Sequence, residues 1–103
     1  MFKITQRHGF HITFENGWTV SVQFGPGNYC DNYYRRIGEE DEICGKEGSS
    51  TAECAVWSRD GGLYPHPDWG GDTVTNRSTP AEVLELLNWA SEKETVAPDT
   101  QGV

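Results

Sequence analysis

Positively charged residues are scarce in this sequence. Its 103 residues include 8 Lys and Arg against 16 Asp and Glu, so the formal net charge is −8 and the isoelectric point is near 4.7. Because nucleic-acid binding and attachment to anionic membranes both depend on Lys and Arg, we expect neither a direct nucleic-acid partner nor a membrane partner. Such an acidic surface either aids solubility or docks on a basic partner, including by mimicking a nucleic acid.

Long apolar runs and export signals are also missing. No run approaches the length of a membrane span, and residues 1–7 lack the apolar segment of a secretory signal peptide. The cysteines Cys30, Cys44 and Cys54 are odd in number and irregularly spaced. Without an export signal, this usage favours reduced thiols in a cytosol.

Motifs for metal binding and catalysis are absent as well. The candidate metal ligands are Cys30, Cys44, Cys54, His8, His11 and His66. They contain no Cys-x-x-Cys pair and match no zinc finger or ribbon. No Gly-x-Ser-x-Gly elbow, carboxylate pair or local Cys-His pair stands out. We therefore expect no cofactor, no metal and no catalytic residue, and keep a small enzyme or metal protein as an alternative.

What is present is a clear strand pattern in residues 9–24. Apolar residues alternate there with polar ones: Phe10, Ile12, Phe14, Trp18, Val20, Val22 and Phe24. This period predicts two half-buried strands joined at Glu15-Asn16-Gly17. A two-residue turn would put the two apolar sets on opposite faces, whereas a three-residue loop that pairs Phe14 with Trp18 puts them on one face. We predict the second register, with Gly17 left-handed in a bulge.

Further strands are indicated on both sides of this hairpin. Residues 2–4 and 51–58 alternate in the same way, and the second of these segments places Cys54 and Trp57 on opposite faces. Leu63-Tyr64 could begin a return strand that nearby prolines would stop, and residues 73–75 could form a short strand.

One helix is predicted near the C-terminus. Thr79 caps it, Pro80 occupies the first helical position and Glu82 completes a capping box. Its apolar stripe is Val83, Leu84, Leu86, Leu87 and Ala90, and the pattern predicts a helix to about Lys93. The fold class is α+β: an antiparallel meander of three to five strands covered on one face by this helix. Residues 1–94 form one domain, and residues 95–103 form a tail.

A longer segment resembles a known family. Residues 17–32, GWTVSVQFGPGNYCDN, are similar to a signature of small bacteriophage and prophage accessory proteins. Residues 52–57 and 79–84 fit the same resemblance, which covers about half of the chain. It implies an accessory protein that acts in a bacterial cytoplasm, and it brings no established activity or site residue.

Two features suggest a binding site. The glycines of Gly25-Pro26-Gly27 could let backbone amides approach an anion, or they could simply end a strand. The following tyrosines and the pair Arg35-Arg36 suit a nucleotide or an acidic peptide; alternatively, the rings cover the core edge and the arginines pair with residues 39–42. The predicted ligand-binding residues are Gly25, Gly27, Asn28, Tyr29, Tyr33, Arg35 and Arg36.

Two tryptophans are candidates for an interface. Trp57 lies on the strand face opposite Cys54, and Trp89 falls beside the apolar stripe of the helix rather than within it. Partly exposed tryptophans often anchor contacts, although plain packing is the alternative. A domain of this size buries a modest share of its surface, so association into a homo-oligomer would help to stabilise it.

These observations lead to one main functional hypothesis. The protein is expected to be a phage-encoded, non-enzymatic binding protein in the host bacterial cytoplasm. It would sequester or inhibit a host factor, either a defence protein or a nucleotide signal, so its partner is a host protein or a small anionic ligand. The alternative is a structural or assembly protein of the virion.

Overall fold

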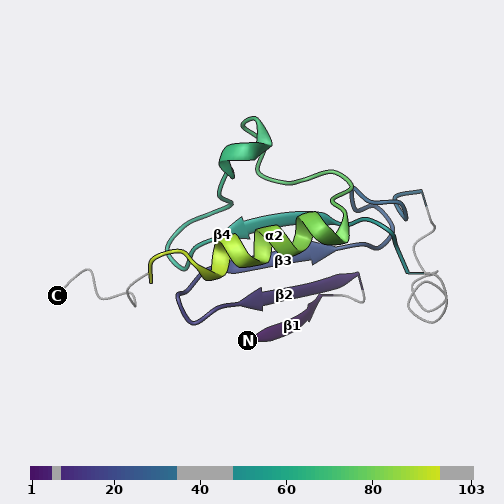
Figure 1. The fold of residues 1–103 in the computed structure, drawn as a ribbon. Helices are drawn as coiled ribbons and strands as arrows, with labels where there is room; N and C mark the ends of the chain where they lie inside the picture. Colours follow the sequence, from purple (N-terminus) through teal and green to yellow (C-terminus); the bar gives the residue numbers. More distant parts are fainter. Residues whose placement is uncertain (6–7, 35–47, 96–103) are drawn as a thin grey trace.

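The computed structural model describes residues 1–5, 8–34 and 48–95. In this part of the chain, an antiparallel sheet and one α-helix form two layers, and the helix lies on one face of the sheet (Figure 1). The strands follow chain order across the sheet: β1 (Phe2–Thr5), β2 (Gly9–Thr13), β3 (Thr19–Gln23) and β4 (Glu53–Trp57). The predicted α+β fold, a meander covered by one C-terminal helix, is confirmed.

The hairpin of β2 and β3 has the predicted register. Phe10 lies opposite Val22 in the ladder. The Phe14 amide donates to the carbonyl of Trp18 at 2.9 Å, and the Gly17 amide donates to the carbonyl of Phe14 at 3.0 Å. Gly17 has a φ of 89°, a left-handed conformation that costs glycine little. The apolar residues of both strands therefore share the face that carries the helix.

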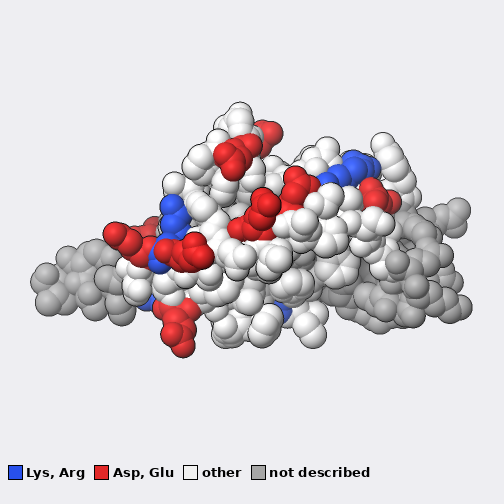
Figure 2. All heavy atoms as spheres, viewed as in Figure 1, with Lys and Arg blue, Asp and Glu red and all other residues white. Residues whose placement is uncertain are grey.

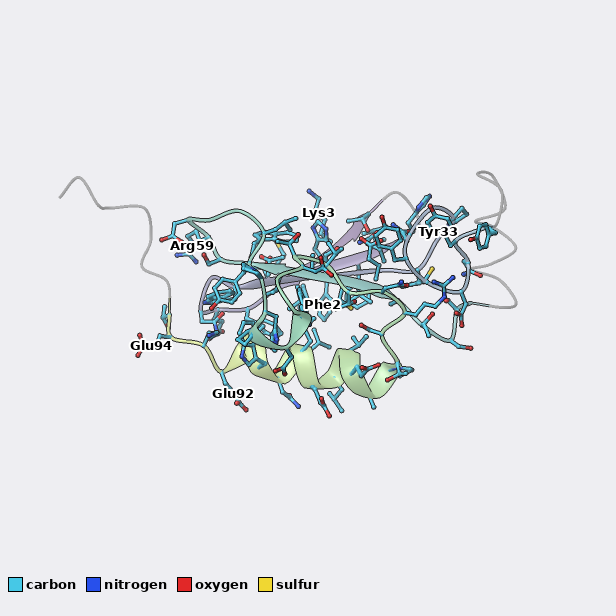
Figure 3. All side chains as sticks on the ribbon, turned by 90° about the horizontal axis from the view of Figure 1, so that it is seen from above. Phe2, Lys3, Tyr33, Arg59, Glu92 and Glu94 are labelled. Atoms are coloured by element: carbon cyan, nitrogen blue, oxygen red, sulfur yellow. The ribbon has the colours of Figure 1, made fainter. Side chains whose placement is uncertain are left out.

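The core lies between this face and the helix α2 (Pro80–Ser91). Val20 of β3 and Val56 of β4 are fully buried, and the helix contributes Leu86 and Ala90. The helix packs over the middle of the sheet, so the edge strand β1 is left uncovered (Figure 1). Phe2 points toward the helix side and Lys3 toward the opposite side (Figure 3), and yet Phe2 is exposed.

Both ends of α2 are fixed by side chains. At its start the Glu82 amide donates to the Thr79 hydroxyl at 3.3 Å, and the Thr79 amide donates to the Glu82 carboxylate at 2.9 Å, as the predicted capping box requires. The helix ends at Ser91, slightly before the predicted end at Lys93. The side-chain amide of Asn16 donates to the carbonyl of Ala90 in the last turn and to that of Lys93 just beyond it.

The segment between β4 and α2 runs along the outer edge of β4. It contains the short 3-10 helix η2 (Pro67–Trp69) and makes only isolated bridges with the strand, at Leu63, Val74 and Ser78. The expected return strands at Leu63-Tyr64 and at residues 73–75 are therefore single bridges rather than strands. Prolines near Leu63 lack the amide that a continued ladder requires, so the chain leaves the sheet there. Residues 96–103 of the predicted tail lie outside the described residues.

Candidate functional site

The loop that follows β3 is closed by its own hydrogen bonds. The Gly25 amide donates to the Asn28 side-chain oxygen at 3.0 Å, and the Asn28 amide donates back to the Gly25 carbonyl at 3.1 Å. Gly27 has a φ of 82°, and its amide donates to the carbonyl of Tyr33 at 3.1 Å. The backbone thus changes direction sharply within a few residues. The left-handed conformation of Gly27 permits this path.

Partners from distant parts of the chain hold this loop against the sheet. The Tyr29 amide donates to the Glu53 carboxylate at 2.7 Å, and the Asp31 amide donates to the Thr51 hydroxyl at 3.0 Å. The Arg77 amide donates to the carbonyl of Tyr29 at 2.8 Å. The loop is therefore tied to both the β4 region and the residues just before α2, and these hydrogen bonds fix much of its conformation.

These hydrogen bonds use the amides that an anion would need. The amides of Gly25, Gly27, Asn28 and Tyr29 each have an acceptor inside the protein, and for Tyr29 that acceptor is already a carboxylate. A Cβ atom at Gly25 would lie 2.8 Å from the ring of His8, so this glycine is required for packing. The backbone of the loop supports a structural role for these residues and offers no amide at these positions to an anion.

The loop displays three tyrosines, and the ring of Tyr33 contacts those of the other two. Tyr29, Tyr33 and Tyr34 are 46%, 37% and 89% exposed. The rings of Tyr29 and Tyr33 stack with centroids 5.8 Å apart, and the ring of Tyr34 meets that of Tyr33 edge-on at 5.0 Å. We call this group the tyrosine surface. Tyr33 lies at one end of the sheet, on the side away from the helix (Figure 3).

An ion pair lies beside the tyrosine surface. The Arg77 side chain approaches the Asp31 carboxylate with an Nε–Oδ1 distance of 3.3 Å, and both side chains are partly exposed. Arg77 has a φ of 54°, a conformation that is uncommon for a residue with a side chain. Sequence reasoning missed Arg77 because its partners are far away in the chain. The predicted Arg35 and Arg36 lie outside the described residues.

The two predicted interface tryptophans are half-buried and make contacts within the protein. Trp57 meets the ring of His11 edge-on, with centroids 5.0 Å apart, on the sheet face away from the helix. Trp89 packs among Trp18, Tyr64 and His66, with centroid distances between 4.4 and 5.8 Å. Their role in an interface remains a prediction, and Trp89 also lines a cleft beside α2.

The described thiols are buried. Cys30 and Cys54 lie in the interior, and burial raises the pKa of the Cys54 thiol to about 11, so it is protonated at neutral pH. Burial and the charge of Lys3 lower the pKa of His11 below its ordinary value. Across the described ranges, no three His, Cys, Asp or Glu side chains gather as metal ligands would. Cys44 lies outside these ranges.

Two further findings bear on identity. No helix in residues 1–5, 8–34 and 48–95 is long and apolar enough to cross a membrane. Comparisons of the chain with protein-family models, with curated proteins and with solved structures found no match. The resemblance to phage accessory proteins therefore stays a prediction.

Proposed function

We propose that this chain is a non-enzymatic binding protein and that the tyrosine surface is its contact site. The observation that carries the proposal is the grouping of Tyr29, Tyr33 and Tyr34, three exposed rings in mutual contact on a loop with a fixed backbone. Tyrosine is enriched in protein interfaces because its ring buries a large apolar area while its hydroxyl keeps a hydrogen-bonding partner.

A fixed loop makes such a surface more effective. Binding usually loses free energy to the ordering of side chains and loops. Here the Glu53 carboxylate, the Thr51 hydroxyl and the Arg77 amide already hold the loop in place, and the stacked rings restrict one another. A partner that covers these rings would gain the buried area with little ordering cost.

The proposed partner is a factor of a bacterial host. The resemblance to phage accessory proteins supports a protein that acts in the host cytoplasm and sequesters or inhibits such a factor. A protein partner fits the exposed rings best, because the amides around Gly25 and Gly27 are already used and the guanidinium of Arg77 is paired with Asp31. The alternative partner is a nucleotide signal that stacks on the rings, and the experiment must distinguish it from a host protein.

The test compares two variants of the full chain. One replaces Tyr29, Tyr33 and Tyr34 with Ser; the control is Leu63→Ser, which removes an exposed apolar side chain elsewhere. Each protein is used to capture partners from a bacterial host lysate, with quantification by mass spectrometry, and is titrated with a panel of cyclic nucleotides by calorimetry.

We expect wild type and Leu63→Ser to recover the same bacterial protein and the triple variant to lose it. If a nucleotide binds wild type and Leu63→Ser but not the triple variant, the tyrosine surface is still the contact site, and its partner is a nucleotide rather than a protein. Equal recovery by all three proteins, or recovery lost equally in both variants, would overturn the proposal.

A further inference from the structure

A cleft lies between α2 and the segment that carries η2. Its volume is about 550 Å³, which falls within the range of sites that hold small molecules or single side chains. Val74 and Leu86 contribute apolar lining. None of the three tyrosines of the tyrosine surface lines this cleft, so the cleft is a separate candidate site.

The charged lining of this cleft has one sign. Four carboxylates line it, those of Asp68, Asp72, Glu82 and Glu85, and no described Lys or Arg does. Figure 2 shows acidic groups on the loop that carries η2 and on the first half of α2, with no basic group on the surface between them. Opposed carboxylates that share no cation create a negative potential in the hollow between them.

The aromatic lining is the second feature of the cleft. The ring of His66 stacks on Trp69 with centroids 5.2 Å apart and lies 4.4 Å from Trp89, and all three rings line the cleft. The faces of indole rings attract cations through their quadrupole. A cleft lined by both aromatic rings and carboxylates has the two features that recognise organic cations.

A contact beside the cleft shows that one of these rings, Trp89, accepts an ammonium group. The Nζ atom of Lys93 lies 4.3 Å from the ring centroid of Trp89 and 5.6 Å from those of Trp18 and Tyr64. The molecule thus already holds one ammonium against the aromatic group to which Trp89 belongs. The same indole also borders the cleft.

We propose that this cleft binds an organic cation, an alkylammonium or guanidinium group. The carboxylates supply the charge and the ring of Trp69 supplies a cation–π contact. A metal ion fits less well, because among the described residues no three such ligands converge on a point. The cation can come from a free polyamine or from a Lys or Arg side chain of a protein, and the two sources share the same chemistry.

The test titrates the full chain with spermidine and, separately, with a tetralysine peptide, by calorimetry at low and at high salt. The cleft variant combines Asp68→Asn, Asp72→Asn and Glu85→Gln and leaves Glu82, which caps the helix. The control variant combines three exposed acids outside the cleft, Glu15→Gln, Glu92→Gln and Glu94→Gln. Both variants lose the same amount of negative charge.

We expect the cleft variant to bind at least about tenfold more weakly and the control variant to stay within about twofold. Trp69→Leu should weaken binding several-fold, and Trp69→Phe should restore part of it. Binding of spermidine alone identifies a free polyamine as the source, and binding of the peptide alone identifies a protein side chain. The proposal is overturned if wild type binds neither probe, if cleft and control variants weaken equally, or if Trp69→Leu has no effect.

Discussion

Asn16 connects the hairpin turn to the end of the helix. It is only 8% exposed. Its side-chain amide donates to the carbonyls of Ala90 at 2.8 Å and Lys93 at 3.0 Å, and its side-chain oxygen accepts from the Trp18 amide at 3.0 Å. A single side chain therefore donates to one carbonyl in the last turn of α2 and to one just beyond it, a region where helix carbonyls lack intrahelical donors. We expect it to be among the most sensitive polar positions of the fold.

The informative change is Asn16→Asp, which keeps the shape of the side chain. It removes both donors, each of which contributes about 0.5–1.5 kcal/mol. It also places a carboxylate against two carbonyl oxygens at the negative end of a helix dipole. We expect the free energy of unfolding to fall by about 3–5 kcal/mol at neutral pH, a large share of the 5–15 kcal/mol that is typical of a domain. Asn16→Ala, which adds no charge, should cost about 2–3 kcal/mol.

The pH dependence identifies the cause. In the Asn16→Asp variant, the nearby carbonyls disfavour the carboxylate and raise its pKa in the folded state above the unfolded value of about 3.9. The folded state then binds the proton more tightly, so the variant loses stability as pH rises through the folded pKa and recovers part of it as pH falls.

Urea denaturation followed by tryptophan fluorescence measures this effect, with wild type and Asn16→Ala at each pH as controls. The reasoning is refuted if Asn16→Asp lies within about 1 kcal/mol of wild type at neutral pH. It is also refuted if the difference between Asn16→Asp and Asn16→Ala does not shrink as pH falls.

Two other changes test the sheet. Burial and the charge of Lys3 lower the pKa of His11 below 6.5. The unfolded state therefore binds the imidazole proton more tightly than the folded state does. The protein consequently loses stability as pH falls below 6.5. Lys3→Gln should raise the pKa of His11 in an NMR titration, and an unchanged value would contradict the assignment. Gly9→Ala should destabilise by about 1–3 kcal/mol, since its Cβ would collide with the backbone of β3. Gly62→Ala, which meets only open space, should change stability by less than about 0.5 kcal/mol in the same urea assay.

The parts of the fold that could be predicted are those encoded by nearby residues. The register of the hairpin follows from strict alternation on both sides of residues 15–17, because a three-residue loop puts every apolar residue on one face and a two-residue turn does not. The helix start follows from Thr79 and Glu82, which bond to each other. Each of these signals needs only a few neighbouring residues to be read.

The parts that could not be predicted depend on residues far apart in the chain. Nothing near Tyr29 indicates that Glu53 accepts from its amide or that Arg77 donates to its carbonyl. The glycines at positions 25 and 27 are compatible with an anion site or with a strand-ending turn, and only the structure shows that the amides of this loop are used internally.

The acidic cleft escaped sequence analysis for the same reason. Asp68 lies in η2 and Glu85 lies in α2, so the two residues are well separated in the sequence. They line the same cleft only because the segment that carries η2 packs beside α2. Trp89 was noticed because it falls outside the apolar stripe of the helix. Its ring neighbours Tyr64 and His66 come from the segment that precedes the helix.

The central claim is that the tyrosine surface contacts a partner in bacterial cells. Photo-crosslinking tests it directly: a photoreactive phenylalanine analogue replaces Tyr34, which is 89% exposed, and in a matched protein it replaces Leu63. After irradiation of intact host cells, mass spectrometry identifies what is attached at each position. We predict a covalent adduct with one bacterial partner from position 34 and none from position 63. Equal adducts from both positions, or an adduct from position 63 alone, would contradict the account.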